Sequence, residues 1–363
     1  MVTPDLSALG WAELWAPQLQ NYGKERLVRI TSRHKGFFPA ISAVGHSLNC
    51  YLPGRLQFQA AASEFPTVGD WCVIDGEEFK DAGGNVAATI LEVLPRRSKI
   101  SRLASGHETA EQVLAANIDY CFIVTSANRE FNLKRLQRYV LITRQGGVEP
   151  VVILSKIDIA EELAAVEQDL QRDFPGLAVI KTSIPLHTGL DGIRKYLPTG
   201  KTGMFIGSSG VGKSTLVNAL LQQDMQQTRE IRETDDRGRH TTSASSLLFI
   251  PGGGMIIDTA GLREIQVFGD SAGLEQTFEN IQRFAGSCKF RDCTHATEPG
   301  CAVQTALACG ELSRDEYDNH IKLQKELGYS NRQVDQRAAA QEKKRSKQIT
   351  QGLRKKRKSE EKD

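Results

Sequence analysis

The sequence predicts an α/β protein with a small β-barrel before its central domain and a metal-binding helical module after it. Between about residues 100 and 284, apolar strands alternate with helical stretches, which is typical of a mostly parallel sheet. Between about residues 25 and 95, short apolar runs are separated by glycines, which is typical of a small barrel of the OB type. Near the C-terminus, three cysteines and a histidine crowd into positions 288–301, which indicates a bound metal.

Composition places the chain among soluble globular proteins. It has 363 residues, 40% of them hydrophobic and 25% charged, which is enough for two or three domains. No apolar run approaches the roughly 20 residues of a membrane span. The N-terminus also lacks the basic-then-apolar pattern of a signal peptide. We therefore expect a cytoplasmic monomer with no membrane partner, in which Cys50, Cys72 and Cys121 are reduced and buried.

The net charge of +2 is unevenly distributed along the chain. Residues 341–363 hold ten Lys/Arg and four acids, a net +6, which leaves −4 for the rest. Such a block without aromatic residues favours salt-sensitive contact with phosphates, without sequence preference, and the alternative is a solvated, disordered end. The pattern divides the chain into an N-terminal extension (1–24), an OB-type barrel (25–97), an α/β domain (98–283), a zinc-binding module (284–330) and a basic tail (331–363).

Apolar spacing predicts the elements of the first two segments. One short helix should dock in the extension, with an apolar side made by Leu6, Leu9, Trp11, Leu14, Trp15 and Leu19. Of the five or so strands of the barrel, four are clear from the sequence: 27–31, 47–52, 71–74 and 86–91. The run Arg96-Arg97-Ser98-Lys99 closes the barrel as a basic patch, either a solvated linker or an RNA contact.

The α/β domain should place its ligand at the carboxyl ends of its strands, where open sheets of this class bind ligands. Helical stretches cover 133–144 and 159–174. Strands are expected to end at Thr125, Leu154, Lys181, Ile206, Ile250 and Ile257, and polar motifs follow several of them.

The strand that ends at Ile206 leads into a stretch with the G-x-x-x-x-G-K-[ST] spacing of a phosphate-binding loop. Its glycines let successive backbone N–H groups point at an anion, and the next helix presents its positive end. Lys213 should reach the β- and γ-phosphates and act in catalysis, and Ser214 should bind Mg²⁺. The alternative is a glycine-rich turn without function. The loop and its helix start comprise Gly207, Ser208, Ser209, Gly210, Val211, Gly212, Lys213, Ser214 and Thr215.

Two further motifs fit the phosphate side of a nucleotide site. Asp258-Thr259-Ala260-Gly261 follows an apolar strand, so Asp258 could act on Mg²⁺ through water and the Gly261 N–H could face the γ-phosphate. Gly238–Thr242 lies between this motif and the loop, where a threonine would complete the Mg²⁺ shell. We expect that threonine to be Thr242, with Thr241 as the alternative.

Base recognition is expected at two other strand ends. Ser155-Lys156-Ile157-Asp158 follows the strand that ends at Leu154. An aspartate there accepts from the N1 and 2-amino groups of guanine, which adenine does not offer, and the stem of Lys156 can cover the ring. Thr182-Ser183-Ile184 can supply a backbone N–H to the guanine oxygen. In ordinary GTPases these motifs come last, whereas here they precede the phosphate loop, so the strands are permuted.

These motifs resemble those of the circularly permuted, ribosome-associated GTPases of the RsgA (YjeQ) family. The similarity extends over nearly the whole chain and includes Phe65–Trp71, Leu94–Arg97 and Asn117–Asp119. The chain departs from the family at Ser155, where Asn or Thr is usual. A serine keeps a hydroxyl, but we expect it to lose the reach of an amide to the purine and to the phosphate loop, which would weaken guanine affinity.

The resemblance also bears on catalysis. Many GTPases place a glutamine directly after D-x-x-G to orient the attacking water. That position here is Leu262, whose apolar side chain cannot orient water. The family resemblance implies instead that His240 orients the water. The alternative is that His240 only holds its loop or touches RNA. No K⁺ site is expected, because Gly210 stands where an asparagine would hold one.

Cys288, Cys293, His295 and Cys301 offer three thiolates and an imidazole, the set that closes a structural Zn²⁺ site. Cys309 is the rival for a ligand place, and free thiols are the alternative to a site. A helix should follow over 312–327.

The resemblance implies a GTP hydrolase that converts GTP to GDP, with Mg²⁺ and one Zn²⁺ as cofactors. It also implies that the protein binds the small ribosomal subunit and its rRNA, assists late maturation and is released by hydrolysis. One alternative is a nucleotide-gated RNA-binding factor in which turnover is incidental. A small-molecule kinase is disfavoured, because the sequence shows a guanine reader and no arginine-rich lid.

Overall fold

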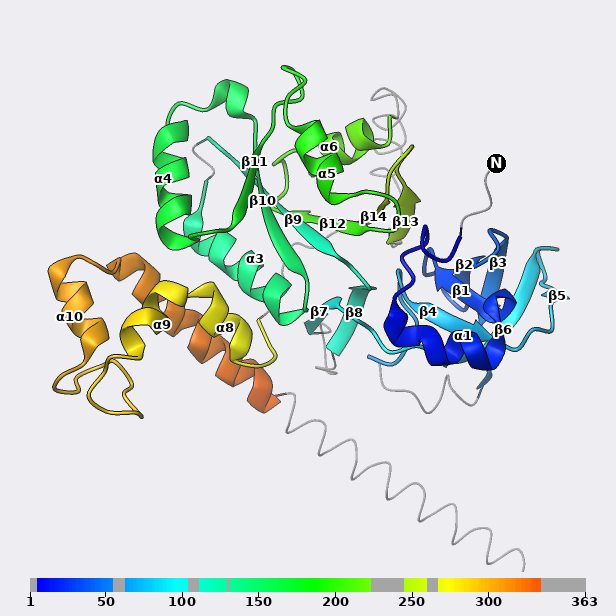
Figure 1. Ribbon diagram of the computed structural model, residues 1–363, viewed down its shortest axis with the longest axis horizontal. Coiled ribbons are helices and arrows are strands. Elements are labelled where there is room, and N and C mark those ends of the chain that lie inside the picture. Colours follow the sequence, from blue (N-terminus) through cyan, green and yellow to red (C-terminus); the bar gives the residue numbers. More distant parts are fainter. Residues whose placement is uncertain are drawn as a thin grey trace, which may run out of the picture.

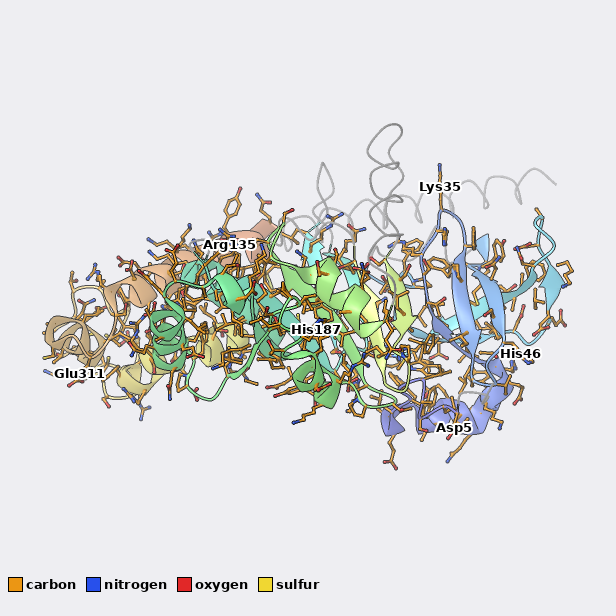
Figure 2. The ribbon with its side chains drawn as sticks, turned by 90° about the horizontal axis from the view of Figure 1, so that it is seen from above. Asp5, Lys35, His46, Arg135, His187 and Glu311 are labelled. Carbon is orange, nitrogen blue, oxygen red and sulfur yellow. The ribbon has the colours of Figure 1, made fainter. Side chains whose placement is uncertain are left out.

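The computed structural model describes residues 5–54, 63–103, 111–128, 131–222, 245–259 and 267–333. Three bodies follow one another along the molecule: a barrel, a central α/β sheet and a helical module (Figure 1). The barrel and the module lie at opposite ends, as His46 and Glu311 mark in the second view (Figure 2). No helix within the described ranges combines the length and apolarity that a membrane crossing requires.

The N-terminal barrel is closed by five strands. The ring runs β3-β2-β1-β4-β6, and β6 pairs in parallel with β3 to close it. This order is that of an OB-type barrel, and β5 only adds to the outer edge of β6. The strands are β1 Leu27–Ile30, β2 Phe38–Ser42, β3 Ser47–Tyr51, β4 Trp71–Ile74, β5 Phe79–Lys80 and β6 Val86–Val93. The sequence analysis missed β2, because Pro39 lies inside it and proline usually argues against a strand.

The N-terminal extension docks on the barrel, as predicted. Its helices are η1 Glu13–Trp15, α1 Ala16–Tyr22 and η2 Lys24–Arg26. Trp15 is fully buried, packs near Trp11 and Trp71, and donates from its indole nitrogen to the Pro95 carbonyl at 2.8 Å. Leu14, in contrast, is 47% exposed.

A hairpin of two strands leads from the barrel into the central sheet, whose order is β11-β10-β9-β12-β14-β13. All neighbours are parallel except β13 and β14. The chain moves outward from β9 through β10 to β11 and then returns to place β12 on the other side of β9. The switch point of the sheet therefore lies between β9 and β12, where open α/β sheets bind ligands. The strands are β7 Lys99–Leu103, β8 Glu111–Ala116, β9 Tyr120–Ser126, β10 Glu149–Ser155, β11 Ala178–Lys181, β12 Thr202–Gly207, β13 Ser246–Phe249 and β14 Met255–Asp258.

Helices cover both faces of this sheet. On one face, α3 and α4 bury residues such as Val140 and Leu170 against the strands. On the other, α5 and α6 bury residues such as Ile193 and Leu216. The helices are α3 Leu133–Gln145, η3 Ile157–Ile159, α4 Leu163–Asp173, α5 Leu190–Tyr196 and α6 Lys213–Leu220.

The barrel and the sheet are joined around one buried arginine. The Arg29 guanidinium is fully buried and donates to the carbonyls of Leu9, Gly69 and Asn117 and to the Thr202 hydroxyl. Thr202 begins β12, so this joint lies at the opposite end of that strand from the phosphate loop. Burial lowers the pKa of Arg29 to about 10, so it stays charged at neutral pH.

The structure contradicts one of the two interpretations of the basic patch, that Arg96 and Arg97 lie in a solvated linker, and the RNA contact stays a prediction. Arg96 makes an ion pair at 2.8 Å with Asp70, whose side chain is fully buried. Arg97 pairs with Asp119 at 3.0 Å, and Lys201 pairs with the same carboxylate. Both arginines therefore belong to the joint between barrel and sheet, and not to a solvated linker.

The helical module packs against α3, beside the central sheet (Figure 1). Its apolar residues, among them Val303, Tyr317 and Leu323, continue the hydrophobic core of that face of the sheet. The expected last helix is present and longer than predicted, since residues 314–333 are helical. The other helices are α8 Ala272–Thr277, α9 Glu279–Ala285 and α10 Ala302–Cys309.

Candidate nucleotide-binding site

The phosphate loop lies at the switch point, between the end of β12 and the start of α6. Its glycines are required by geometry, because Gly210 and Gly212 have φ of +81° and +99°. A Cβ on Gly207 would lie 2.3 Å from the Val124 carbonyl oxygen of β9. Lys213 and Ser214 open α6, so the backbone N–H groups of that helix start face the loop. The arrangement is that of an anion-binding cradle.

Lys213 is held over this cradle. Its ammonium group donates to the carbonyls of Gly207 and Ser208, the first at 2.9 Å. Burial lowers its pKa, and the Asp258 carboxylate opposes that shift. Asp258 ends β14 as an exposed residue, and Ser214 is exposed in the first turn of α6. A hydroxyl and a carboxylate are the hard oxygen donors that Mg²⁺ takes, so these two residues fit such an ion.

Several predicted residues lie outside the part of the chain that the structure describes. They are His240, Thr241, Thr242, Gly261 and Leu262. Their roles remain predictions.

Ser155 corrects one expectation from the sequence. Its side chain does reach the phosphate loop, because Ser155 Oγ donates to the Val211 carbonyl at 2.7 Å and lies 3.2 Å from the Thr125 carbonyl oxygen. The short side chain suffices because Ser155 ends β10, directly beside the loop, and is only 4% exposed. The hydroxyl therefore ties the base-recognition motif to the loop.

The two segments predicted to recognise the base are joined to each other by backbone hydrogen bonds. The Ile157 N–H donates to the Thr182 carbonyl at 3.4 Å, and the Thr182 N–H to the Leu154 carbonyl at 2.8 Å. Lys156 has a left-handed backbone with φ of +58°, which turns the chain so that Asp158 is exposed. The Ser183 N–H donates to the Thr188 carbonyl at 3.2 Å. Asp158 and the Thr182–Ile184 segment thus lie at the same strand edge as the phosphate loop.

One residue at this site escaped the sequence analysis. Arg135, in the first turn of α3, donates from its guanidinium to the Ser208 hydroxyl at 2.5 Å. Its position in the sequence could have identified it, because α3 follows the central strand β9. Residues that follow such a strand lie at the edge of the sheet where ligands bind. Arg135 was overlooked because an arginine at the start of a helix usually belongs to a solvated face.

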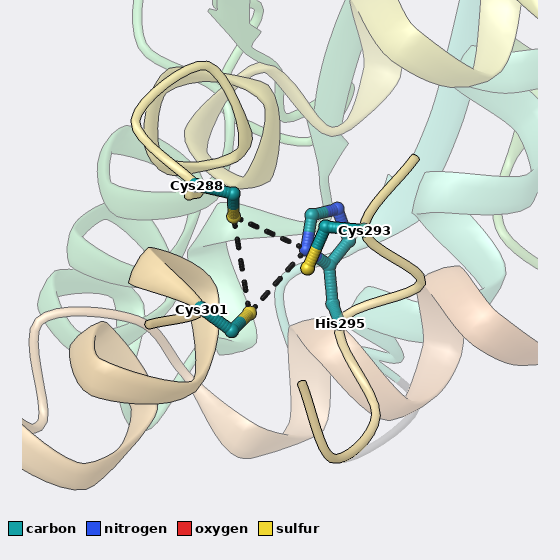
Figure 3. A group of neighbouring side chains, drawn as sticks. All are labelled: Cys288, Cys293, His295 and Cys301. Carbon is teal, nitrogen blue, oxygen red and sulfur yellow. Dashed lines mark hydrogen bonds between the residues drawn. The ribbon is translucent and has the colours of Figure 1, made fainter. Parts of the chain in front are cut away.

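A second site lies in the helical module. Cys288, Cys293, His295 and Cys301 place their ligand atoms within 4.8 Å of one another (Figure 3). His295 Nδ1 is 3.5 Å from the sulfurs of Cys288 and Cys301, which are 3.9 Å apart. Two thiolates on a tetrahedral Zn²⁺ would be about 3.8 Å apart, given Zn–S bonds of about 2.3 Å. The cluster could therefore hold one metal ion.

The surroundings of the cluster fix its ligands. The His295 carbonyl accepts from Tyr317 Oη at 2.7 Å, and Cys301 is the N-cap of α10, where its sulfur accepts from the Gln304 N–H at 3.5 Å. Cys309, the rival ligand, is exposed at the far end of α10 and outside this group. The four expected residues are thus brought together without it.

The fold and the phosphate loop together define a circularly permuted P-loop GTPase with an N-terminal OB-type barrel and a C-terminal Cys/His cluster. The family described as RsgA GTPase matches residues 93–268. A relative from Opitutus terrae, named small ribosomal subunit biogenesis GTPase RsgA, is 39% identical over 96% of this chain and 97% of its own length. A relative of the same name from Methanosarcina acetivorans is 40% identical over 91% of this chain and 87% of its own length. The chain belongs to the RsgA family of GTPases.

Solved structures support the same fold. The crystal structure of YjeQ from Thermotoga maritima is 26% identical, with a TM-score of 0.61 over 83% of this chain and 98% of that one. YloQ, described as a circularly permuted GTPase, is 24% identical, with a TM-score of 0.58 over 86% of this chain and 95% of that one. The permuted strand order that the sequence predicted is therefore confirmed.

Proposed function

We propose that this protein hydrolyses GTP to assist late maturation of the small ribosomal subunit, and that hydrolysis releases it from the particle. The observation that carries the proposal is the similarity, over nearly the full chain, to relatives named for small ribosomal subunit biogenesis. The phosphate loop at the switch point supports the chemistry. On this proposal the protein acts as a monomer in the cytoplasm and binds GTP, GDP, the small subunit and its rRNA.

Within the nucleotide site, each predicted residue receives a role. Asp158 pairs with the guanine edge, the stem of Lys156 covers the ring, and a backbone N–H of the Thr182–Ile184 segment faces the guanine oxygen. Lys213 contacts the β- and γ-phosphates with the N–H groups of residues 208–215. Ser214 holds Mg²⁺, with Asp258 acting through water and Thr242 completing the shell. When bound, Mg²⁺ neutralises charge on the β- and γ-phosphates.

His240 is proposed to orient the attacking water, because Leu262 has no group that could. On this view the small subunit orders the loop that carries His240, which shifts the protein toward a competent conformer. His240→Ala should bind nucleotide and subunits like the parent but lose about 10²–10⁴-fold in subunit-stimulated rate. The measurement is the single-turnover rate on saturating small subunits. A rate equal to that of the parent would leave His240 with a structural role.

The Cys₃His cluster is proposed to hold one structural Zn²⁺. Its four protein ligands leave no open position, so the ion would stabilise the module and take no part in hydrolysis. Elemental analysis of the purified protein should find one zinc per chain, and a folded protein without metal would refute the assignment.

The central test is the rate of GTP hydrolysis with and without small ribosomal subunits. We expect slow turnover by the free protein and a large stimulation by small subunits, but not by large ones. Lys213→Ala should abolish turnover, and Asp158→Asn should weaken GTP binding and relax discrimination against xanthosine nucleotides. If subunits bind in a GTP-dependent way but do not stimulate turnover, the protein would instead be a nucleotide-gated RNA-binding factor.

A further inference from the structure

Arg135 differs from its cationic neighbours on α3 in what it contacts. Lys134 pairs with Asp315 at 2.8 Å, and Arg138 pairs with Glu326 through both nitrogens at 2.5 and 2.6 Å. These two acids belong to the last helix of the module. Arg135 donates instead to a neutral hydroxyl, that of Ser208 in the phosphate loop. Among the described residues, no carboxylate pairs with Arg135, so its charge is not compensated by an ion pair.

The backbone of Arg135 is fixed although its side chain is exposed. Its N–H donates to the side chain of Asn132, the N-cap of α3, at 2.9 Å. Leu136, in the same turn, is 2% exposed and packs in the core of the sheet, which fixes the position of this turn. Figure 2 shows Arg135 near the upper edge of the ribbon, where it is exposed to solvent.

A guanidinium that has no ion-pair partner and lies beside a phosphate-binding loop is suited to bind a phosphate group. Phosphate oxygens accept two parallel N–H donors from arginine, an interaction stronger than one to a neutral hydroxyl. We propose that Arg135 exchanges the Ser208 hydroxyl for the terminal phosphate of bound GTP and stabilises the charge that develops there during hydrolysis. The proposal rests on the GTPase function and adds a catalytic residue that lies outside the sequence motifs.

The chemistry of the step is ordinary hydrolysis. The oxygen of water bonds to the γ-phosphorus, while the bond from that phosphorus to the β–γ bridging oxygen breaks and leaves its electron pair on GDP. The proton of the water ends on inorganic phosphate. Arg135 stays protonated throughout and acts only on the charge of the equatorial and bridging oxygens, as an arginine supplied in cis does in other phosphoryl transfers.

This role predicts that Arg135 matters for the triphosphate and the transition state but not for the diphosphate. In Arg135→Ala, the Kd of GDP should stay within about twofold of the parent. Single-turnover GTP hydrolysis should slow by about 10- to 10³-fold, the usual effect of removing one donor to a developing charge. Binding of GDP with aluminium fluoride, which mimics the transition state, should weaken by a similar factor. Arg135→Lys should be intermediate, because lysine keeps the charge but loses the planar fork.

Lys134→Ala is the matched control, since it removes the adjacent cation and a contact to the module but no contact to the loop. It should hydrolyse GTP at the parent rate. Equal rates for Arg135→Ala and Lys134→Ala would overturn the inference. An equal loss of GDP affinity in Arg135→Ala would overturn it as well, because Arg135 would then only shape the loop. A parent protein that does not hydrolyse GTP would instead reject the proposed function itself.

Discussion

The central sheet is joined to the barrel around Arg29 and to the helical module along α3. The charged residues of these two joints differ in how deeply they are buried. At the barrel joint, the Arg29 guanidinium is fully buried and its donors go to backbone carbonyls and one hydroxyl. At the module joint, the Arg138–Glu326 pair is about one quarter exposed on each side, and Lys134–Asp315 is more exposed still. A buried cation that loses its hydrogen-bond partners lowers the stability of the fold by several kcal/mol. An exposed ion pair contributes little, because water replaces its contacts. The buried Arg29 network therefore contributes more to holding the barrel than these ion pairs contribute to holding the module. The module is held mainly by the apolar core that Val303 and Leu323 share with the sheet.

The module joint also contacts the segment of chain that follows the predicted D-x-x-G motif. Glu326, the partner of Arg138, also accepts from the Val267 N–H at 3.4 Å, and Asn331 exchanges hydrogen bonds with Gly269. Val267 and Gly269 follow the D-x-x-G segment that should sense the γ-phosphate. The module joint is thus in contact with the chain that follows the predicted switch segment, so we expect a change in that segment to reach the module before the barrel.

The largest effect on stability is expected from removing the zinc ion that we propose for the Cys₃His cluster of the module. Metal binding to such a cluster is worth about 10 kcal/mol or more in small zinc domains, so its loss should unfold the module. Cys293→Ser should lose the zinc and its hydrogen-exchange protection over residues 280–333, while the barrel keeps its own protection. Cys309→Ser is the control and should retain the metal. Loss of protection in the barrel would show that the two joints are not independent.

The second largest effect on stability is expected from replacing Arg29 at the barrel joint. Arg29→Met fills part of the space but leaves the carbonyls of Leu9 and Asn117 without the donor that Arg29 supplies, while Gly69 keeps only the side-chain amide of Asn117. We expect a loss of about 3–5 kcal/mol in the free energy of unfolding, the usual cost of disrupting a buried charged network. Chemical denaturation measures it, and Lys35→Met, an exposed cation on the same barrel, should change little. A loss below about 1 kcal/mol would contradict the contrast between the joints.

A buried carboxyl group at the module joint should make that joint sensitive to pH. Glu316 is 3% exposed, faces Asp173 and Arg172 of α4, and accepts from Asn280. Burial and the Asp173 charge raise the pKa of Glu316 from 4.5 to about 7. The native state therefore favours the protonated form, so this contribution to stability is present below about pH 4.5 and lost as the pH rises through 7.

Glu316→Gln should remove this pH dependence. It should be more stable than the parent at pH 8, by about 1–2 kcal/mol, and roughly equal to it at pH 4.5. The measurement is the difference between the two unfolding curves across that range, with the exposed Glu311→Gln as the control. A parallel pH dependence in parent and Glu316→Gln would place the titrating group elsewhere.

The same two joints show what a sequence can and cannot reveal. The phosphate loop, the base motifs and the metal cluster were predicted because their spacing follows from the ligand they hold. Ser155 was misjudged, since its reach depends on how closely β10 lies beside the loop. The burial of Arg29 and the pairing of Arg96 with a buried carboxylate were not recognised, because only the fold brings their partners beside them. Arg135 was missed for a related reason, as its contact spans 73 residues of sequence.

The smallest effect concerns the ion pair that defines the exposed joint. Arg138 and Glu326 form a bidentate pair, but their side chains are 27% and 26% exposed, so water screens the attraction. A double-mutant cycle of Arg138→Ala and Glu326→Ala should give a coupling of about 0.5–1 kcal/mol. Because Glu326 also accepts from Val267, Glu326→Ala should cost more than Arg138→Ala. The cycle should be run with GDP and with a non-hydrolysable GTP analogue. A coupling that is the same in both nucleotide states would mean that the module joint does not sense the switch, and the two joints would then differ in strength alone.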